Sequence, residues 1–180
     1  MEKFHGLMDK VCTELYTGAT WHGRMANEFR KNGLRGFARW AEAEARGDFK
    51  SRACLEKLLC DNLDYCPVID TTNATKAVMF EISGVQGLKP TLEKWYHNEK
   101  EFIDILTQAV RESTTINMSI YKELCGILEE VQAEAMRVKM CDKRLNIAGY
   151  NGHDIGIVSY LLHEHFEKTP DDRYVNVNLG

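Results

Sequence analysis

Three acidic residues, Glu14, Asp48 and Glu99, lie inside rows of positions that repeat every three or four residues. Such a row forms one face of a packed helix. The rows run through residues 7–28, 37–58 and 88–106. A carboxylate buried alone in a helix face is costly, so each of these groups needs a partner. Because a cation is a common partner for carboxylates on facing helices, the spacing predicts a metal site inside a helical protein.

Other interpretations of these carboxylates remain open. A glutamate in a helix row often reaches water at the rim or pairs with a lysine or an arginine. Glu130 is a fourth candidate, one turn before Glu134 at the edge of a further row, although Glu129 and Glu130 could equally form a solvated face. For Glu14, Asp48 and Glu99 together, in the middle of three helices, we favour metal binding.

The elements that position these residues are four long helices and a short fifth one. We expect helices at about 3–31, 34–62, 89–112, 116–142 and 154–167, with Gly33 in a left-handed cap after the first helix and Asp154 as the N-cap of the last. The weakly periodic segment 63–87 predicts a long crossover with a short helical piece at 77–82. Because a crossover makes the second and third helices parallel, the expected fold is an all-α four-helix bundle. We expect one domain over 1–180 with a polar tail from 168.

Composition agrees with this architecture and excludes several classes of function. The chain has 180 residues, of which 44% are hydrophobic and 28% charged, and only three are prolines. The net charge of −4 and the lack of a basic stretch argue against nucleic-acid binding. No apolar run is long enough to cross a membrane. The six cysteines form no CxxC pair, so we expect reduced thiols in the cytoplasm, most of them in the core.

Five strings of the sequence, in the same order along the chain, resemble ferritins. They are KVCTELYTGATWHGRMANEF, GLRGFARWAEAEARGDF, WYHNE, ILEEVQAE and CDKRLNIAGYNGHDIG. The resemblance covers residues 2–166. It implies a ferritin-like four-helix bundle that stores iron and oxidises Fe(II) at inward carboxylates, which would make the chain a ferroxidase if its site is active.

The resemblance also implies a set of iron ligands. Glu14 matches the terminal ligand of the first helix, Asp48 the bridging glutamate of the second, Glu99 the third-helix ligand and Glu130 the fourth-helix position. The second-helix motif departs from the family, because Asp48 and Ser51 stand where ferritins have Glu-x-x-His. Trp21 replaces the tyrosine expected beside the site. A weakened oxidation site is therefore the expectation.

The family further implies a homo-oligomer, a hollow twenty-four-subunit shell in the cytoplasm, with no nucleic acid or membrane as partner. The apolar fifth helix supports assembly independently, because its hydrophobic surface is too large to face water. Two alternatives remain open. One is a shell-forming or mineral-nucleating subunit without a working oxidation site, and the other is a different di-iron carboxylate enzyme built on a helical bundle.

Overall fold

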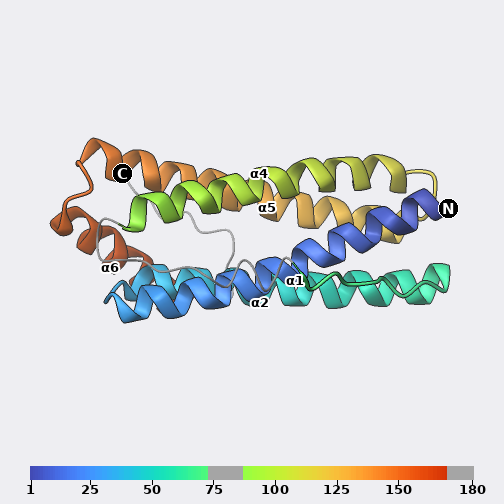
Figure 1. Cartoon of the computed structure of the whole chain (residues 1–180), viewed down its shortest axis with the longest axis horizontal. Helices are drawn as coiled ribbons and strands as arrows, with labels where there is room; N and C mark the ends of the chain where they lie inside the picture. Colours follow the sequence, from blue (N-terminus) through green and yellow to red (C-terminus); the bar gives the residue numbers. More distant parts are fainter. Residues whose placement is uncertain (73–86, 170–180) are drawn as a thin grey trace.

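The computed structural model describes residues 1–72 and 87–169, and in these ranges the chain is helical (Figure 1). The five helices in these ranges are α1 (Glu2–Lys31), α2 (Arg35–Leu63), α4 (Leu88–Ser113), α5 (Met118–Ile147) and α6 (Gly152–Lys168). The predicted all-α class and the five predicted helices are confirmed. The helical piece expected at 77–82 and the tail beyond residue 169 lie outside the described residues.

Four helices form the bundle and the fifth closes one end of it. In Figure 1, α1 and α2 run antiparallel, as do α4 and α5, whereas α2 and α4 run in the same direction. The parallel pair confirms the predicted crossover between the second and third long helices. Helix α6 folds back at the end of the bundle where α2 begins and packs against α2.

The ends of the helices show why the chain turns where it does. Gly33 has φ +75° and its N–H donates to the carbonyl of Arg30, while Leu34 N–H donates to the carbonyl of Phe29. These two bonds form the Schellman motif that ends α1, as predicted. The Asn117 side chain caps α5 by accepting from two backbone N–H groups.

The start of α6 differs from the sequence-based prediction. Asn151 is the N-cap, and its side-chain oxygen accepts a hydrogen bond from Asp154 N–H. Asp154, expected to be the cap, lies in the first turn instead. Its negative charge is favourable there, because the first turn of a helix carries partial positive charge. The helix therefore begins two residues before the predicted boundary.

The apolar face of α6 packs onto the bundle of its own chain. Ile155, Val158, Leu162 and Phe166 are all buried within this single chain. We expected this face to lie between subunits, and the physical reason for the difference is that the start of α2 supplies the apolar surface. Ile157 and Tyr160 remain exposed on α6, at 38% and 60% of their accessible surface.

The hydrophobic core is divided into two clusters, one toward each end of the bundle. One cluster contains the α1 residues from Trp21 to Phe29 and reaches α6, whereas the other contains the α1 residues from Phe4 to Leu15. Between them each bundle helix contributes buried polar side chains, namely His22, Glu44, Asp48, Glu99 and Glu134. A polar layer therefore crosses the middle of the bundle.

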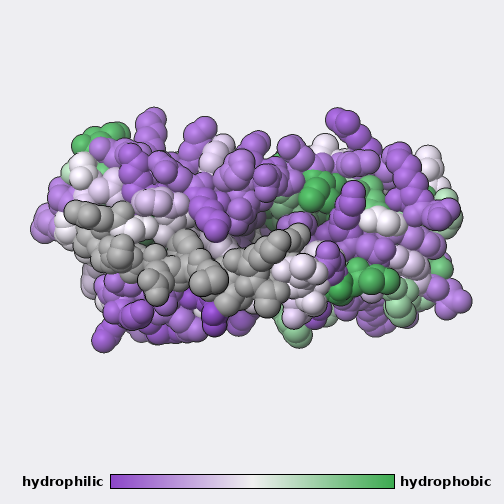
Figure 2. Space-filling view, viewed as in Figure 1, coloured by the Kyte–Doolittle hydropathy of each residue, from purple (hydrophilic) through white to green (hydrophobic). Residues whose placement is uncertain are grey.

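The outer surface is largely hydrophilic on the face shown in Figure 2, with a few hydrophobic groups between hydrophilic ones. Exposed apolar side chains include Met136, Met140 and Ile147, which lie on α5. Within the described residues, no helix combines the length and the apolar character needed to span a lipid bilayer.

Gly36 is the residue that allows α6 to approach α2. Its N–H donates to Ser159 Oγ at 3.1 Å, and a Cβ at this position would lie 1.7 Å from the Ser159 carbonyl oxygen. Because that atom belongs to the backbone, α6 would have to move. We predict that Gly36→Ala lowers the free energy of unfolding by about 2–3 kcal/mol, measured by denaturant unfolding.

Gly126 provides the matched control, because a Cβ there would meet no atom within 4 Å. Gly126→Ala should be neutral or should stabilise the helix by about 0.5–1 kcal/mol. Equal effects of the two substitutions would contradict the close approach of α6 to α2.

Candidate metal centre

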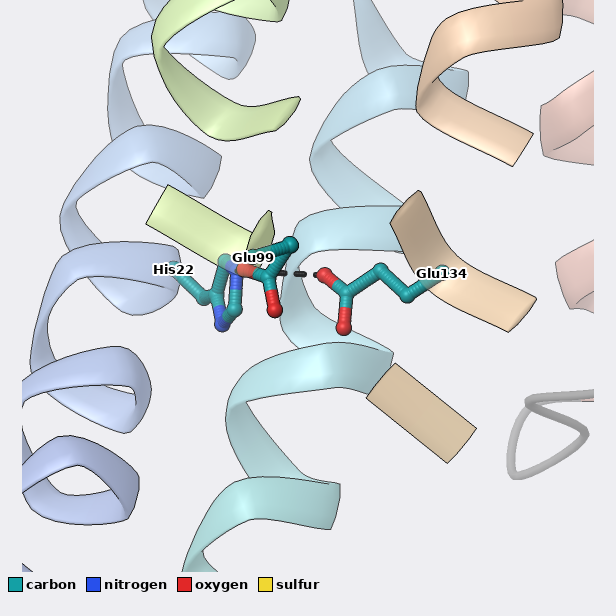
Figure 3. A group of neighbouring side chains, drawn as sticks. All are labelled: His22, Glu99 and Glu134. Carbon is teal, nitrogen blue, oxygen red and sulfur yellow. Dashed lines mark ion pairs between the residues drawn. The ribbon is translucent and has the colours of Figure 1, made fainter. Parts of the chain in front are cut away.

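The buried polar layer brings together one side chain from each of the four bundle helices. His22 comes from α1, Asp48 from α2, Glu99 from α4 and Glu134 from α5. Each of them keeps 6% or less of its accessible surface. In Figure 3, the imidazole of His22 and the carboxylates of Glu99 and Glu134 point toward one another inside the bundle. The four helices thus converge on one imidazole.

The two ring nitrogens of His22 have different surroundings. Nδ1 lies 2.8 Å from Oδ2 of Asp48 and hydrogen-bonds to it. Nε2 lies 3.2 Å from Oε1 of Glu134 and 3.5 Å from Oε1 of Glu99, yet it makes no hydrogen bond of acceptable geometry. The Asp48 carboxylate therefore orients the ring, while Nε2 faces the gap between two glutamates.

Indole groups hold the glutamates of this layer in place. Trp95 Nε1 donates to Oε1 of Glu134 at 2.7 Å, and Trp40 Nε1 donates to Oε1 of Glu44 at 3.0 Å. Glu44 also accepts from Arg137, whose Nη2 lies 3.4 Å away. Trp40 and Trp95, both buried in the core, therefore also position carboxylates.

Burial and mutual attraction determine the charges of the group. Burial alone would lower the pKa of His22, but the nearby Glu134, Asp48 and Glu99 outweigh it and hold that pKa well above its usual value. Burial and the Glu134 charge raise the pKa of Glu99 to about 8, although His22 opposes the rise. Burial would likewise raise the pKa of Glu134, yet the cationic His22 and the Trp95 hydrogen bond keep it below its usual value. At neutral pH a protonated imidazole thus faces an ionised Glu134 and a largely neutral Glu99.

A pocket of about 320 Å³ leads from the surface to this group between α1 and α4. Its lining includes the buried His22, Asp48 and Glu99, together with the exposed Glu101. Gly18 leaves room for the Asp48 carboxylate in this wall, because a Cβ at position 18 would lie 2.7 Å from Oδ2 of Asp48. The pocket therefore reaches three residues of the buried group.

The structure places the four predicted ligands at different distances from the centre. Glu99 is part of the group around Nε2, and Asp48 lies on the opposite side of the imidazole. Glu14 is half-buried in the pocket wall, where burial and Glu101 raise the pKa of its carboxyl group. Glu130 is half-buried on α5, one turn before Glu134. Metal binding by these four residues stays a prediction.

Sequence reasoning missed His22 and gave Glu134 little weight. The row predicted over residues 7–28 contains Trp21 rather than His22. A step of four residues from Gly18 nevertheless leads to His22, and a further step of three leads to Met25, which is buried. The buried face of α1 is thus wide enough to include both neighbours. For Glu134 the signal was its place one turn beyond Glu130.

The chemistry of the donor atoms fits a divalent metal ion. His22, Glu99 and Glu134 each offer one ligand atom, and these three atoms lie within 4.8 Å of one another. Ligands about 2.0–2.2 Å from a metal are separated by roughly 3.0–3.4 Å. The distances from Nε2 to the two oxygens are already close to that range. Among the described residues this is the only such group found.

The titration of the centre predicts how stability depends on pH when a chelator removes metal. The pKa of Glu99 rises from its usual 4.5 to about 8 on folding, so the folded chain binds an extra proton between these pH values. The free energy of unfolding therefore falls as pH rises through that window. The contribution of His22 is complete below pH 6.5 and is lost as pH rises through its raised pKa. The pKa of Glu134 is lowered, so its contribution to folding stability is complete above pH 4.5 and is lost as pH falls below that value. We therefore predict greatest stability at about pH 4.5–5 and a decline toward about pH 9.

Glu99→Gln tests this prediction, because glutamine imitates the neutral carboxyl group. The variant should lose less stability than wild type between pH 5 and pH 8, with a difference on the order of a few kcal/mol at the upper end. Denaturant unfolding with a chelator present measures it. Glu93→Gln, an exposed site on the same helix, is the control, and parallel pH profiles for all three proteins would refute the titration scheme.

Comparisons with known proteins identify the architecture. No family model matches the sequence, and no curated protein matches it. Among solved structures, an open-pore ferritin from the hyperthermophilic archaeon Archaeoglobus fulgidus is similar, with a TM-score of 0.75 and 15% identity over 91% of this chain and 97% of that chain. An engineered closed form of the Archaeoglobus fulgidus ferritin has a TM-score of 0.74 and 15% identity, over 91% of this chain and 96% of that one. The chain therefore has the ferritin-like fold, with a buried cluster of histidine and carboxylates inside its bundle.

Proposed function

We propose that this chain is an iron-storage and detoxification protein that binds one Fe(II) per bundle through His22, Glu99 and Glu134. The observation that carries the proposal is the state of the imidazole. Nδ1 is bound by Asp48, whereas Nε2 is buried between two glutamate oxygens without a hydrogen bond of its own. Iron rather than another divalent ion is inferred from the ferritin-like fold, because nitrogen and oxygen donors suit several metals.

The contacts around the centre are those that a metal-binding histidine needs. Such a histidine usually donates its second ring N–H to a carboxylate, which fixes the tautomer and the ring orientation. Asp48 is that carboxylate for Nδ1 of His22. Trp95 orients Glu134 in an equivalent way, by donating its indole N–H to Oε1. An incoming Fe(II) would replace the proton on His22 and the proton on Glu99, so its binding should release protons.

Oxidation at such a centre should be slower than at a two-iron centre. One Fe(II) supplies one electron, whereas reduction of O₂ to peroxide requires two. A single ion per chain therefore needs a second electron from elsewhere. This agrees with the missing second-helix histidine, whose position is held by Ser51. We propose weak ferroxidase activity, with the pocket beside Gly18 admitting the ion.

A shell subunit without an oxidation site is the second candidate function. It is favoured by the raised pKa of His22, which the carboxylates of Glu134, Asp48 and Glu99 hold up against the effect of burial. The protonated imidazole would then be a permanent internal cation, which satisfies the carboxylates as a metal would. In that case the polar layer is structural, and iron is handled elsewhere in the assembly.

Both candidates include assembly into a cytoplasmic 24-subunit shell, as the ferritin resemblance implies. Because one face of α6 packs on its own chain, the surface for assembly has to come from side chains that stay exposed. Met136, Met140 and Ile147 lie exposed along α5 and supply apolar contact area. Sedimentation of the full chain measures the particle mass, and a monomer would contradict the shell.

Anaerobic titration with Fe(II), or with Co(II) as a spectroscopic probe, tests metal binding. We predict one ion per chain, with an affinity that rises from pH 6 to pH 9 because the ion displaces protons from His22 and Glu99. Glu134→Gln should abolish this binding. Asp48→Ala, which removes only the group that orients the imidazole, should weaken it by about 10–100-fold.

Glu130→Gln is the matched control, because Glu130 lies one turn away on the same helix and outside the three-ligand group. It should bind the ion as wild type does. If wild type binds no ion in the bundle, the second candidate function, a shell subunit without an oxidation site, replaces the proposed one. If Glu130→Gln is as defective as Glu134→Gln, the ligand set is different.

A further inference from the structure

Two exposed cysteines meet where α2 ends. Cys60 lies in the last turn of α2 and Cys66 lies beyond the helix, yet their sulfur atoms are only 3.0 Å apart and share a hydrogen bond. Both residues are exposed. All six cysteines of the chain are within the described residues, and this is the one pair found with its sulfurs in contact there.

The turn after α2 places the two thiols together. Asp64 adopts a left-handed conformation with φ 51°, and its N–H donates to the carbonyl of Cys60. Tyr65 N–H donates to the carbonyl of Leu59. These bonds reverse the chain direction, so Cys66 returns to the side of the helix that carries Cys60.

The segment that follows is held against α1. The Tyr65 ring stacks on His5 with centroids 3.8 Å apart, and its hydroxyl donates to Asp9 at 2.5 Å. Val68 N–H also donates to Asp9, and Asp70 N–H donates to Thr13. Because these contacts fix the chain after the turn and α2 fixes it before the turn, the proximity of the two thiols is built into the fold.

We propose that Cys60 and Cys66 form a redox-active dithiol that hydrogen peroxide converts to an intramolecular disulfide. One thiolate attacks a peroxide oxygen, which gives a sulfenic acid and one water molecule. The second thiol then attacks that sulfur and expels a second water molecule. Two thiols lose two hydrogen atoms and two electrons, and the peroxide is reduced to two water molecules.

The geometry requires little movement for this reaction. A disulfide bond is about 2.05 Å long, so the sulfurs have to approach by roughly 1 Å. Side-chain rotation at the end of a helix can supply that shift. The hydrogen bond with Cys66 raises the pKa of the Cys60 thiol, which lowers the thiolate fraction at neutral pH. Oxidation should therefore be slow near neutral pH and accelerate as pH rises and more thiolate forms.

The consequence of oxidation would be a covalent clamp between α2 and the segment that packs on α1. It does not depend on metal binding at the buried centre. Backbone amides at Tyr65, Val68 and Asp70 make the hydrogen bonds of this segment. Their hydrogen exchange should slow in the oxidised protein, because opening the segment would require the turn to move against the new bond.

Mass spectrometry of the full chain after treatment with hydrogen peroxide tests the proposal. Free thiols should fall from six to four, the chain should lose about 2 Da, and a reductant should reverse both changes. Peptide mapping should join Cys60 to Cys66. Cys60→Ser and Cys66→Ser should each abolish the cross-link, whereas Cys54→Ser, an exposed cysteine on the same helix, should retain it.

Three results would overturn the proposal. They are six free thiols after treatment, an intramolecular disulfide that includes Cys54, or cross-links only between chains. Because wild-type mapping alone separates these results from the expected one, the test does not rely on the variants folding. The failure of this proposal can be told apart from the failure of the proposed function. A chain that forms the Cys60–Cys66 cross-link but binds no iron contradicts only the proposed function, and a chain that binds iron but forms no cross-link contradicts only this proposal.

Discussion

The structure depends on the burial of three carboxylates around a single imidazole. Asp48, Glu99 and Glu134 lie in the middle of the bundle, where an unpaired charge is strongly unfavourable. His22 contacts all three, at 2.8, 3.5 and 3.2 Å respectively. Every bundle helix contributes one of these four residues, so the pairing also fixes the relative position of the helices. A proton on the imidazole and a divalent metal beside it are two ways of meeting the same electrostatic requirement.

This constraint explains features of the surrounding core that packing alone does not. The polar layer separates the two hydrophobic clusters, and indoles rather than aliphatic side chains border it because they fill volume and also donate hydrogen bonds. Gly18 has no side chain where Asp48 approaches α1. Arg137 adds a second cation beside Glu44. Groups from several turns of the bundle helices thus contribute to the layer.

The sequence predicted the fold more completely than the site, for physical reasons. Helix periodicity, the Gly33 cap and the long weakly periodic segment are local signals, and they were enough to predict five helices and a crossover. The site depends on which residues of facing helices meet, and that is not local. Asp48 and Glu99 were selected because they are acidic residues in helix rows. His22 was overlooked because its neighbour Trp21 fits the same row, and the thiol pair of Cys60 and Cys66 depends on a left-handed turn at Asp64.

Diffraction from crystals loaded anaerobically with Fe(II), recorded at the iron absorption edge, tests the central claim most directly. The account predicts one anomalous peak in the bundle, about 2.0–2.3 Å from Nε2 of His22 and from one oxygen each of Glu99 and Glu134, with Asp48 still bound to Nδ1. A peak elsewhere in the bundle, or no peak with His22 still surrounded by the three carboxylates, would contradict it.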